Sequence, residues 1–218
     1  MLSSRNDGKV APIIAFCGID GSGKTTIVDR LRRDPRFRAA SFVKKEQKED
    51  FERLLRLAPP REPMPTAYFH GMFAQASRWA HALDFLRFYE TVVRPLEPVA
   101  PLIVSDRWSF CTITFADIGT NLKAEIEFIL RSVPGPALTF YLDVDPKVAI
   151  ERLTRRGPLA HDEHAELLAA YRDAYERYFS TYRRPLVRVA SSSPDEEYGI
   201  VLAALQEHRL IPVSINSQ

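Results

Sequence analysis

The sequence predicts an α/β domain with a parallel sheet, and three observations support this prediction. Short apolar runs recur along the 218 residues. Between them lie longer stretches whose apolar residues have helical spacing, an alternation typical of strands joined by helices. The third observation is a glycine-rich turn between the first apolar run and the first helical stretch. Such a turn joins a strand to a helix in one short step.

Five strands are expected, one for each apolar run. In chain order the runs are PIIAFC (12–17), AASFVKK (39–45), PLIVSD (101–106), LTFYLDV (138–144) and PLVRVA (185–190). The second run carries flanking charges, so its pattern is the weakest of the set.

The helices are expected at residues 25–33, 72–93, 145–157 and 166–183, and from residue 193 onward. Asp145 has the chemistry of an N-cap, Pro146 fits the first helical position and Gly157 fits the stop. Ser193 before Pro194 repeats the start signal, with three acids in the following turn.

Two of these helices carry stripes of large apolar residues. The stripe of the 72–93 helix is Trp79, Leu83, Leu86 and Val93, and that of the 166–183 helix is Leu168, Tyr171, Tyr175, Tyr178 and Tyr182. The tyrosine stripe is typical of core packing.

Composition narrows the class of protein. The hydrophobic content of 45% is ample for a core, and the formal charge of +2 comes from acids and bases spread along the chain. No polybasic tail or apolar span points to nucleic acid or membrane, and two cysteines form no metal or disulfide pattern.

We expect a soluble cytoplasmic protein with a frayed start (1–10), one domain (11–212) and a short tail (213–218). The clearest loop is the proline-rich stretch 57–65.

The glycine-rich turn GIDGSGKTT matches a phosphate-binding pattern in full. Gly18, Gly23, Lys24 and Thr25 satisfy G-x-x-x-x-G-K-[ST], with a strand before and a helix after. Glycines let backbone N–H groups point inward around an anion, and the helix N-terminus adds its dipole. Lys24 supplies a charge for the β and γ phosphates. The residues expected to hold the nucleotide are Gly18, Gly21, Ser22, Gly23, Lys24, Thr25 and Thr26.

A Mg²⁺ ion bound with the nucleotide is expected to use Thr25 and Asp106. The Thr25 hydroxyl is placed to be a ligand, and Asp106 follows directly after an apolar run, at the end of a second strand. Asp106 could instead be a helix or turn cap. Asp143 and Asp145 are further carboxylates, for which capping is the stronger interpretation.

Arginines away from the turn favour a small-molecule kinase over a GTPase or a motor ATPase. The guanine-specific N-K-x-D element is absent from the sequence. Arg152, Arg155 and Arg156 share one side of a helix that ends in a candidate lid, residues 152–165. A transferred phosphoryl group needs such charges, and the turn itself carries Asp20 but no arginine.

The chain resembles the thymidylate kinases and their nucleoside monophosphate kinase relatives. FCGIDGSGKTT is similar to the family's phosphate loop, FAQASRW to its substrate-helix arginine motif and SDRWSF to its Asp-Arg-Tyr element. YLDVDPKVAIERLTRRG resembles its strand and lid helix, and these blocks keep their order across about residues 11–210. The resemblance implies a P-loop NTPase three-layer sandwich, in which a five-stranded parallel sheet has helices on both faces, and it implies a protein that is often dimeric.

The resemblance also implies roles for residues. ATP would lie on the backbone of residues 21–26 and the Lys24 side chain. Asp20 would face the sugar hydroxyl of the acceptor, Arg78 and Arg107 would hold its phosphate, and Phe73 would stack on its base or belong to the core. One or more of Arg152, Arg155 and Arg156 would close over the transferred group.

The sequence departs from the family on the acceptor side. Cys17 stands where bacterial members carry Glu, SFVKKEQKEDF lacks the family's glycine pair, and Lys44 and Lys45 replace an arginine only in charge. Ala116 falls where the family reads the thymine region with Gln or Thr, and Phe73 lies five residues before Arg78 instead of four.

These departures leave the acceptor open. It is dTMP by default, another nucleoside monophosphate or a related metabolite. A hydroxyl acceptor would need a base, with Asp20 or Glu46 as first candidates. The alternative from another class is a nucleotide-binding regulatory protein whose acceptor site has decayed. Both a monomer and a homodimer fit the sequence.

Overall fold

The five expected strands form one parallel sheet. The computed structural model describes residues 10–45, 49–50, 53, 74–159, 163–190 and 193–211. Its strands are β1 (Ile13–Cys17), β2 (Ser41–Lys44), β3 (Ile103–Asp106), β4 (Leu138–Asp143) and β5 (Leu186–Ala190), in the spatial order β2-β3-β1-β4-β5. All neighbouring pairs are parallel, so the prediction is confirmed, including the weakly marked second strand.

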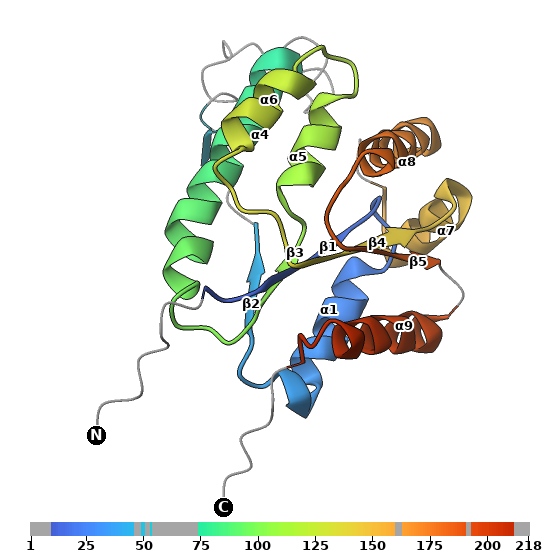
Figure 1. Cartoon of the computed structure of the whole chain (residues 1–218). Coiled ribbons are helices and arrows are strands. Elements are labelled where there is room, and N and C mark those ends of the chain that lie inside the picture. The colour runs from blue at the N-terminus through green and yellow to red at the C-terminus, as the bar shows by residue number, and fades with distance from the viewer. Residues whose placement is uncertain are drawn as a thin grey trace, which may run out of the picture.

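Helices cover both faces of this sheet (Figure 1). They are α1 (Lys24–Arg33), α4 (Ala74–Phe88), α5 (Ser109–Ala116), α6 (Lys123–Leu130), α7 (Pro146–Arg156), α8 (Ala165–Ser180) and α9 (Pro194–Glu207), with short turns at Pro35–Phe37, Tyr89–Val93 and Arg94–Leu96. Within the described residues, no helix has the length and apolar character needed to span a membrane.

The core has two parts, one on each face of the sheet. Successive strand side chains point to opposite faces, so Ile14 and Phe16 of β1 pack with α1 and α9, whereas Ile13, Ala15 and Cys17 pack with α4, α5 and α8. This arrangement is the expected three-layer sandwich.

Local capping signals located the starts of α7 and α9 correctly, whereas the sequence did not predict α5 and α6. Asp145 accepts a hydrogen bond from the Lys147 N–H at 2.8 Å, and Ser193 Oγ accepts one from the Glu196 N–H at 3.3 Å. Gly157 caps the end of α7. The predicted end of the next helix was late, because α8 stops at Ser180.

The expected helix 72–93 is less regular than its sequence suggests. Residues 72 and 73 lie outside the described ranges, and α4 passes at Tyr89 into a π turn. Leu83, on the expected stripe, is 45% exposed, while Phe85 is 1% exposed and meets Trp108 edge to face. The buried face is therefore set by the contact with α5 and its preceding turn, and not by the stripe.

Parallel strands bring their carboxyl ends to one edge of the sheet, which is where ligands bind in such folds. The turn after β1, the end of β3 and the end of β4 meet there, with Phe16 beside Asp106 in the register of β1 and β3. The predicted proline-rich loop, residues 57–65, and most of the frayed end and tail lie outside the described part of the chain.

The central strands predict which substitutions unfold the protein. Phe140 of β4 is fully buried and stacks on Phe16, with ring centroids 4.9 Å apart. We expect Phe140→Ala to lower the free energy of unfolding by about 3–5 kcal/mol, because it leaves a cavity in the core. Urea titration measures this change. Val99→Ala, at a residue that is 72% exposed, serves as the control and should change stability by no more than about 0.5 kcal/mol.

Candidate active site

The glycine-rich loop is pressed against its neighbours. Gly18, Gly21 and Gly23 have φ angles of 140°, 79° and 97°, values that side chains disfavour. A Cβ on Gly18 would lie 2.5 Å from the carbonyl oxygen of Leu142, and one on Gly21 would lie 2.6 Å from that of Ala149. Glycine is therefore required both by the turn and by the close approach of β4 and α7.

Lys24 folds back into the loop. Its Nζ donates to the carbonyl oxygens of Ile19 at 2.8 Å and Gly18 at 3.0 Å, and to Ser22 Oγ at 3.3 Å. The residue is only 6% exposed. Burial and the neighbouring Arg107 lower the pKa of Lys24 to about 8, although the carboxylates of Asp20 and Asp106 partly offset them.

Thr25 and Asp106 meet as the sequence predicts for a metal site. The Thr25 hydroxyl donates to Asp106 Oδ2 at 3.2 Å. Asp106 is 5% exposed, and its other oxygen, Oδ1, is buried and makes no hydrogen bond to any described residue. An unpartnered buried carboxylate oxygen beside a hydroxyl is a hard-oxygen pair that fits Mg²⁺. Asp143, another carboxylate considered for the metal, instead forms ion pairs with Arg172 and Arg188.

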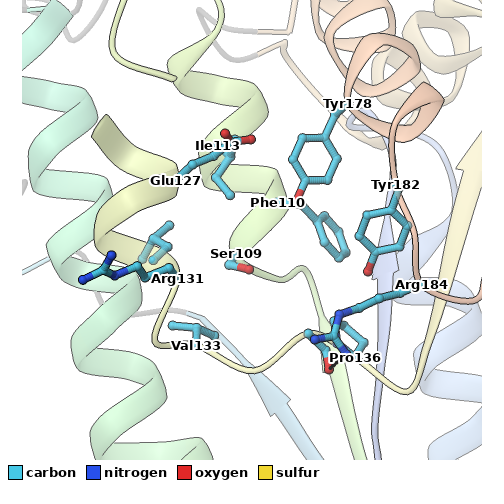
Figure 2. A pocket seen from close by; sticks show the side chains of 12 residues that line it. Ser109, Phe110, Ile113, Glu127, Arg131, Val133, Pro136, Tyr178, Tyr182 and Arg184 are labelled. Atoms are coloured by element: carbon cyan, nitrogen blue, oxygen red, sulfur yellow. Dashed lines mark hydrogen bonds between the residues drawn. The ribbon is translucent and has the colours of Figure 1, made fainter. Parts of the chain in front are cut away.

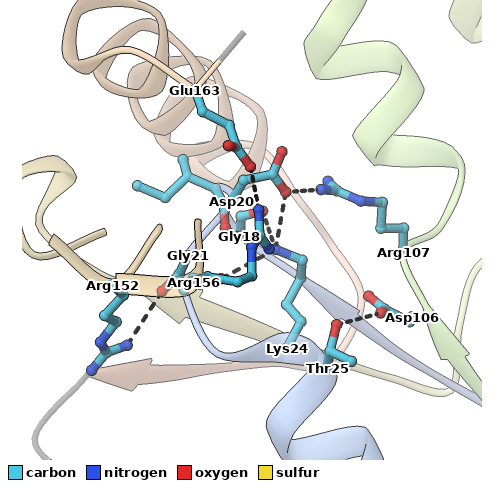
Figure 3. A network of polar contacts seen from close by, with 12 residues as sticks. Gly18, Asp20, Gly21, Lys24, Thr25, Asp106, Arg107, Arg152, Arg156 and Glu163 are labelled. Carbon is cyan, nitrogen blue, oxygen red and sulfur yellow. Dashed lines mark hydrogen bonds and ion pairs between the residues drawn. The ribbon is translucent and has the colours of Figure 1, made fainter. Parts of the chain in front are cut away.

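Asp20 and Arg107 form an ion pair across the mouth of the loop (Figure 3). Arg107 has a φ of 80°, which is uncommon outside glycine and often marks functional sites. Its N–H donates to the Phe16 carbonyl at 2.9 Å, and its carbonyl accepts from Ser105 Oγ at 2.7 Å, which hold this conformation. Burial raises the pKa of Asp20, but Arg107 and Lys24 outweigh it and leave that pKa below its usual value.

The structure separates the three arginines of α7. Arg152 Nη1 donates to the Gly21 carbonyl at 3.4 Å, and Arg156 Nη2 donates to Oε1 of the buried Glu163 at 2.5 Å. Figure 3 places both beside the loop. Arg155 is 79% exposed on its side chain and lies 3.9 Å from Glu151, so it points away. The candidate lid is described except for residues 160–162.

Arg78 of α4 is buried with unused donors. It is 7% exposed; its Nη2 donates to the Ile118 carbonyl at 3.1 Å, while Nε and Nη1 are buried and find no partner among the described residues. Its guanidinium carbon lies 3.5 Å above the Phe115 ring, which stacks on Tyr171. Burial lowers the pKa of Arg78. Two unpaired guanidinium nitrogens are suited to an anionic or carbonyl oxygen of a ligand.

Comparison with known proteins decides the family. The model of the thymidylate kinase family, described as "Thymidylate kinase", matches residues 16–198. This chain belongs to the thymidylate kinase family. It is 30% identical to a probable thymidylate kinase of Metallosphaera sedula over 175 residues, covering 79% of this chain and 80% of the relative. It is 27% identical to one of Methanococcoides burtonii over 173 residues, covering 75% and 80%.

Solved structures show the same fold. The thymidylate kinase of Candida albicans matches with a TM-score of 0.67 at 15% identity, covering 93% of this chain and 94% of that one. That of Ehrlichia chaffeensis matches with a TM-score of 0.63 at 17% identity, covering 90% and 100%. As a thymidylate kinase family enzyme, the protein is a phosphotransferase, and its family implies use of ATP and a nucleotide substrate.

Some residues of this thymidylate kinase family member were not recognised as site residues from the sequence. Phe115, Tyr171 and Glu163 complete the surroundings of Arg78 and Arg156. Tyr171 lies on the stripe assigned to the core, where helical spacing cannot tell a core face from a site wall. Phe73, the expected stacking ring, lies outside the described residues.

The acceptor-side departures also have positions in the structure. Ala116 is fully buried, and Lys45 Nζ donates to the His81 carbonyl of α4 at 3.1 Å. Lys44 stands opposite Asp106 in the register of β2 and β3, at the site edge of the sheet. Cys17 is fully buried, and burial raises the pKa of its thiol well above the usual value. No carboxylate from position 17 therefore competes with Asp20 for Arg107.

A cavity lies elsewhere on the molecule, between α5, α6 and the end of α8 (Figure 2). Its volume is about 220 Å³, and its walls include Phe110, Arg131, Tyr178 and Arg184. Gly135 and Pro136, which precede β4, also line it. None of the predicted site residues lines it.

The lowered pKa of Lys24 predicts proton uptake when ATP binds. At pH 9 most of the free protein carries neutral Lys24, and the negative charge of the triphosphate raises the lysine pKa again. Calorimetric titration in two buffers of different ionisation enthalpy should show clear proton uptake at pH 9 and much less at pH 7. Equal heats in both buffers at pH 9, after correction for ATP itself, would contradict the assignment.

Proposed function

We propose that this family member transfers the γ-phosphoryl group of ATP to a nucleoside monophosphate, with dTMP as the default acceptor. Buried Arg78, with two guanidinium nitrogens that have no described partner, is the observation that carries the proposal. Burying an arginine in this way is costly unless a ligand completes its hydrogen bonds. The buried state of Arg78 therefore supports an intact acceptor site beside the phosphate loop. It argues against a regulatory protein whose acceptor site has decayed.

On the donor side, the backbone N–H groups of residues 18–26 and the Lys24 ammonium would hold the ATP phosphates. Lys24 would leave the carbonyls of Gly18 and Ile19, which it bonds in the free protein, and turn to the phosphates. Thr25 and Asp106 would hold Mg²⁺. When bound, this ion supplies positive charge that neutralises the phosphate oxygens.

On the acceptor side, Arg78 and Arg107 would hold the acceptor phosphate, and Asp20 would orient Arg107 and face the sugar hydroxyl. Arg152 and Arg156 would neutralise charge on the moving group. A phosphate oxygen is already anionic, so transfer needs positioning and charge more than a base.

A hydroxyl acceptor is less well supported. It would need a general base, and Asp20 is engaged by Arg107, which holds its pKa below the usual range. Glu46, the other candidate base, lies outside the described residues.

We further propose a homodimer in a reducing cytoplasm. Leu83 of α4 is 45% exposed and Phe128 of α6 is 61% exposed, on helices that contact each other. Large exposed apolar side chains on neighbouring helices are a feature that an interface between subunits would cover. Both cysteines are free thiols, as a reducing compartment requires.

An acceptor screen tests the function. ADP release from ATP is measured with dTMP, the other nucleoside monophosphates and no acceptor. We expect strong stimulation by at least one monophosphate, and Lys24→Ala and Arg107→Ala should each lower its kcat/KM at least about 100-fold, or ~2.7 kcal/mol. ADP release that no acceptor raises above ATP hydrolysis would overturn the kinase assignment. The buried Ala116 cannot hydrogen-bond a base, so discrimination among bases should be weak.

The arginines of α7 should differ in their effect on catalysis. Arg152→Ala and Arg156→Ala remove guanidinium groups next to the loop, and each should lower kcat at least about 10-fold. Arg155→Ala is the matched control from the same helix, and its exposed side chain predicts a kcat within about twofold of wild type. Steady-state kinetics with saturating acceptor measures the three. A loss at Arg155 as large as at Arg152 would show that α7 turns when substrates bind.

A further inference from the structure

Glu197 is a buried carboxylate that the proposed chemistry does not use. It lies in the first turns of α9 and is 3% exposed. Its Oε1 is buried and has no hydrogen-bond partner among the described residues. Burying a charge without a partner costs several kcal/mol. Since no described residue satisfies this oxygen, the carboxylate is suited to accept a hydrogen bond from a ligand.

The neighbours of Glu197 show that it is not needed to attach α9 to the fold. Asp195 pairs with Arg30 of α1 at 2.8 Å, and the Tyr198 hydroxyl donates to Asp34 Oδ2 at 2.7 Å. Arg30 also lies over the Tyr198 ring. The contacts between α9 and α1 are thus made on either side of Glu197, whose own side chain turns toward the phosphate loop.

The position of Glu197 relative to the loop identifies the part of the ligand it faces. Its Oε2 lies 3.4 Å from the point that a Cβ on Gly23 would occupy, and Arg152 Nη1 lies 3.9 Å from the same point. On the acceptor side, Arg107 directly follows β3, which neighbours β1 on the side away from β4, and Arg78 comes from α4. Glu197 therefore borders the loop on the side of β4 and β5.

A triphosphate on this loop must run from one side to the other. Its γ-phosphate has to face the acceptor, so the α-phosphate and the nucleoside extend toward β4 and β5. The ribose follows the α-phosphate directly, while the base lies farther from the loop. Since Glu197 is close to Gly23, the ribose is the part of the donor within its reach.

We propose that Glu197 accepts a hydrogen bond from a ribose hydroxyl of the donor nucleotide and so makes the enzyme selective for ribonucleoside triphosphates. This inference rests on the proposed function, because it assumes that ATP lies on the loop with its γ-phosphate toward Arg107. A carboxylate is a strong acceptor for sugar hydroxyls, and the bond compensates both the burial of the charge and its repulsion from the phosphates.

The test compares three donors: ATP, 2′-deoxy-ATP and 3′-deoxy-ATP. Their dissociation constants are measured by calorimetry without acceptor, and their kcat/KM values with the acceptor found by the screen. Wild type should favour ATP over at least one deoxy donor by about 10- to 100-fold, the range for a hydrogen bond to a charged group. In Glu197→Ala this ratio should fall to within about threefold of one.

Two further variants make the result specific. Glu197→Gln keeps the side-chain size and a neutral acceptor oxygen, so it should retain an intermediate donor ratio. If thermal melting shows that Glu197→Ala does not fold, Glu197→Gln takes its place in the comparison. Asp195→Ala removes an acid of the same helix turn that faces α1, and it should leave the donor ratio unchanged.

The outcomes separate this inference from the proposed function. Equal use of all three donors by wild type would overturn the role of Glu197, as would a donor ratio that survives in the Glu197 variants. An equal loss with all donors in Glu197→Ala would indicate a structural role, for example positioning Arg152, and would also overturn it. Binding needs no acceptor, so a protein that binds ATP selectively but phosphorylates nothing would refute the kinase assignment alone.

Discussion

The close approach of the phosphate loop to β4 and α7 is the constraint on which the rest of the site depends. Gly18 lies against the Leu142 carbonyl and Gly21 against the Ala149 carbonyl, at distances that leave no room for a side chain. Because the loop is held there, α1 begins at Lys24, and Arg152 of α7 reaches the Gly21 carbonyl. A parallel sheet with β1 between β3 and β4 provides this closeness, since strand ends that are far apart in sequence meet at one edge.

Most cations of the site are balanced by internal acceptors in the free protein. Asp20 lies between Lys24 and Arg107, and Glu163 holds Arg156. These carboxylates offset the repulsion between the cations in the free protein. Under the proposed function, incoming phosphate groups would replace the carboxylates as partners of the cations. Arg78 and Glu197 are the exceptions: each keeps buried polar atoms without a described partner, one on each side of the loop. Under the proposed function, these two unsatisfied groups would mark the acceptor and donor ends of a single bound pair of substrates.

The acceptor side shows how a family site can keep its charges while its polar base contacts differ. Arg78 and Arg107 remain, and the structure adds Phe115 and Tyr171 as a stacked pair beneath Arg78. Ala116, fully buried, offers no side-chain hydrogen bond at the position where the family resemblance implies a contact with the base. Under the proposed function, affinity for the phosphate and selectivity for the base would rest on different residues, so the first can persist when the second is weak.

The sequence by itself determined the strands, most helix starts and the phosphate loop. These depend on residues a few positions apart: glycines for positive φ, Asp145 and Ser193 for caps, and alternating apolar runs for strands. It also named the pair Thr25 and Asp106, because strand ends meet in any parallel sheet. Tertiary structure alone decided which helix arginines face the loop, that Leu83 is exposed, and that Tyr171 and Glu197 border the site. Helical spacing places a side chain on one side of a helix, but the helix's rotation against its neighbours is set by packing contacts between distant parts of the chain.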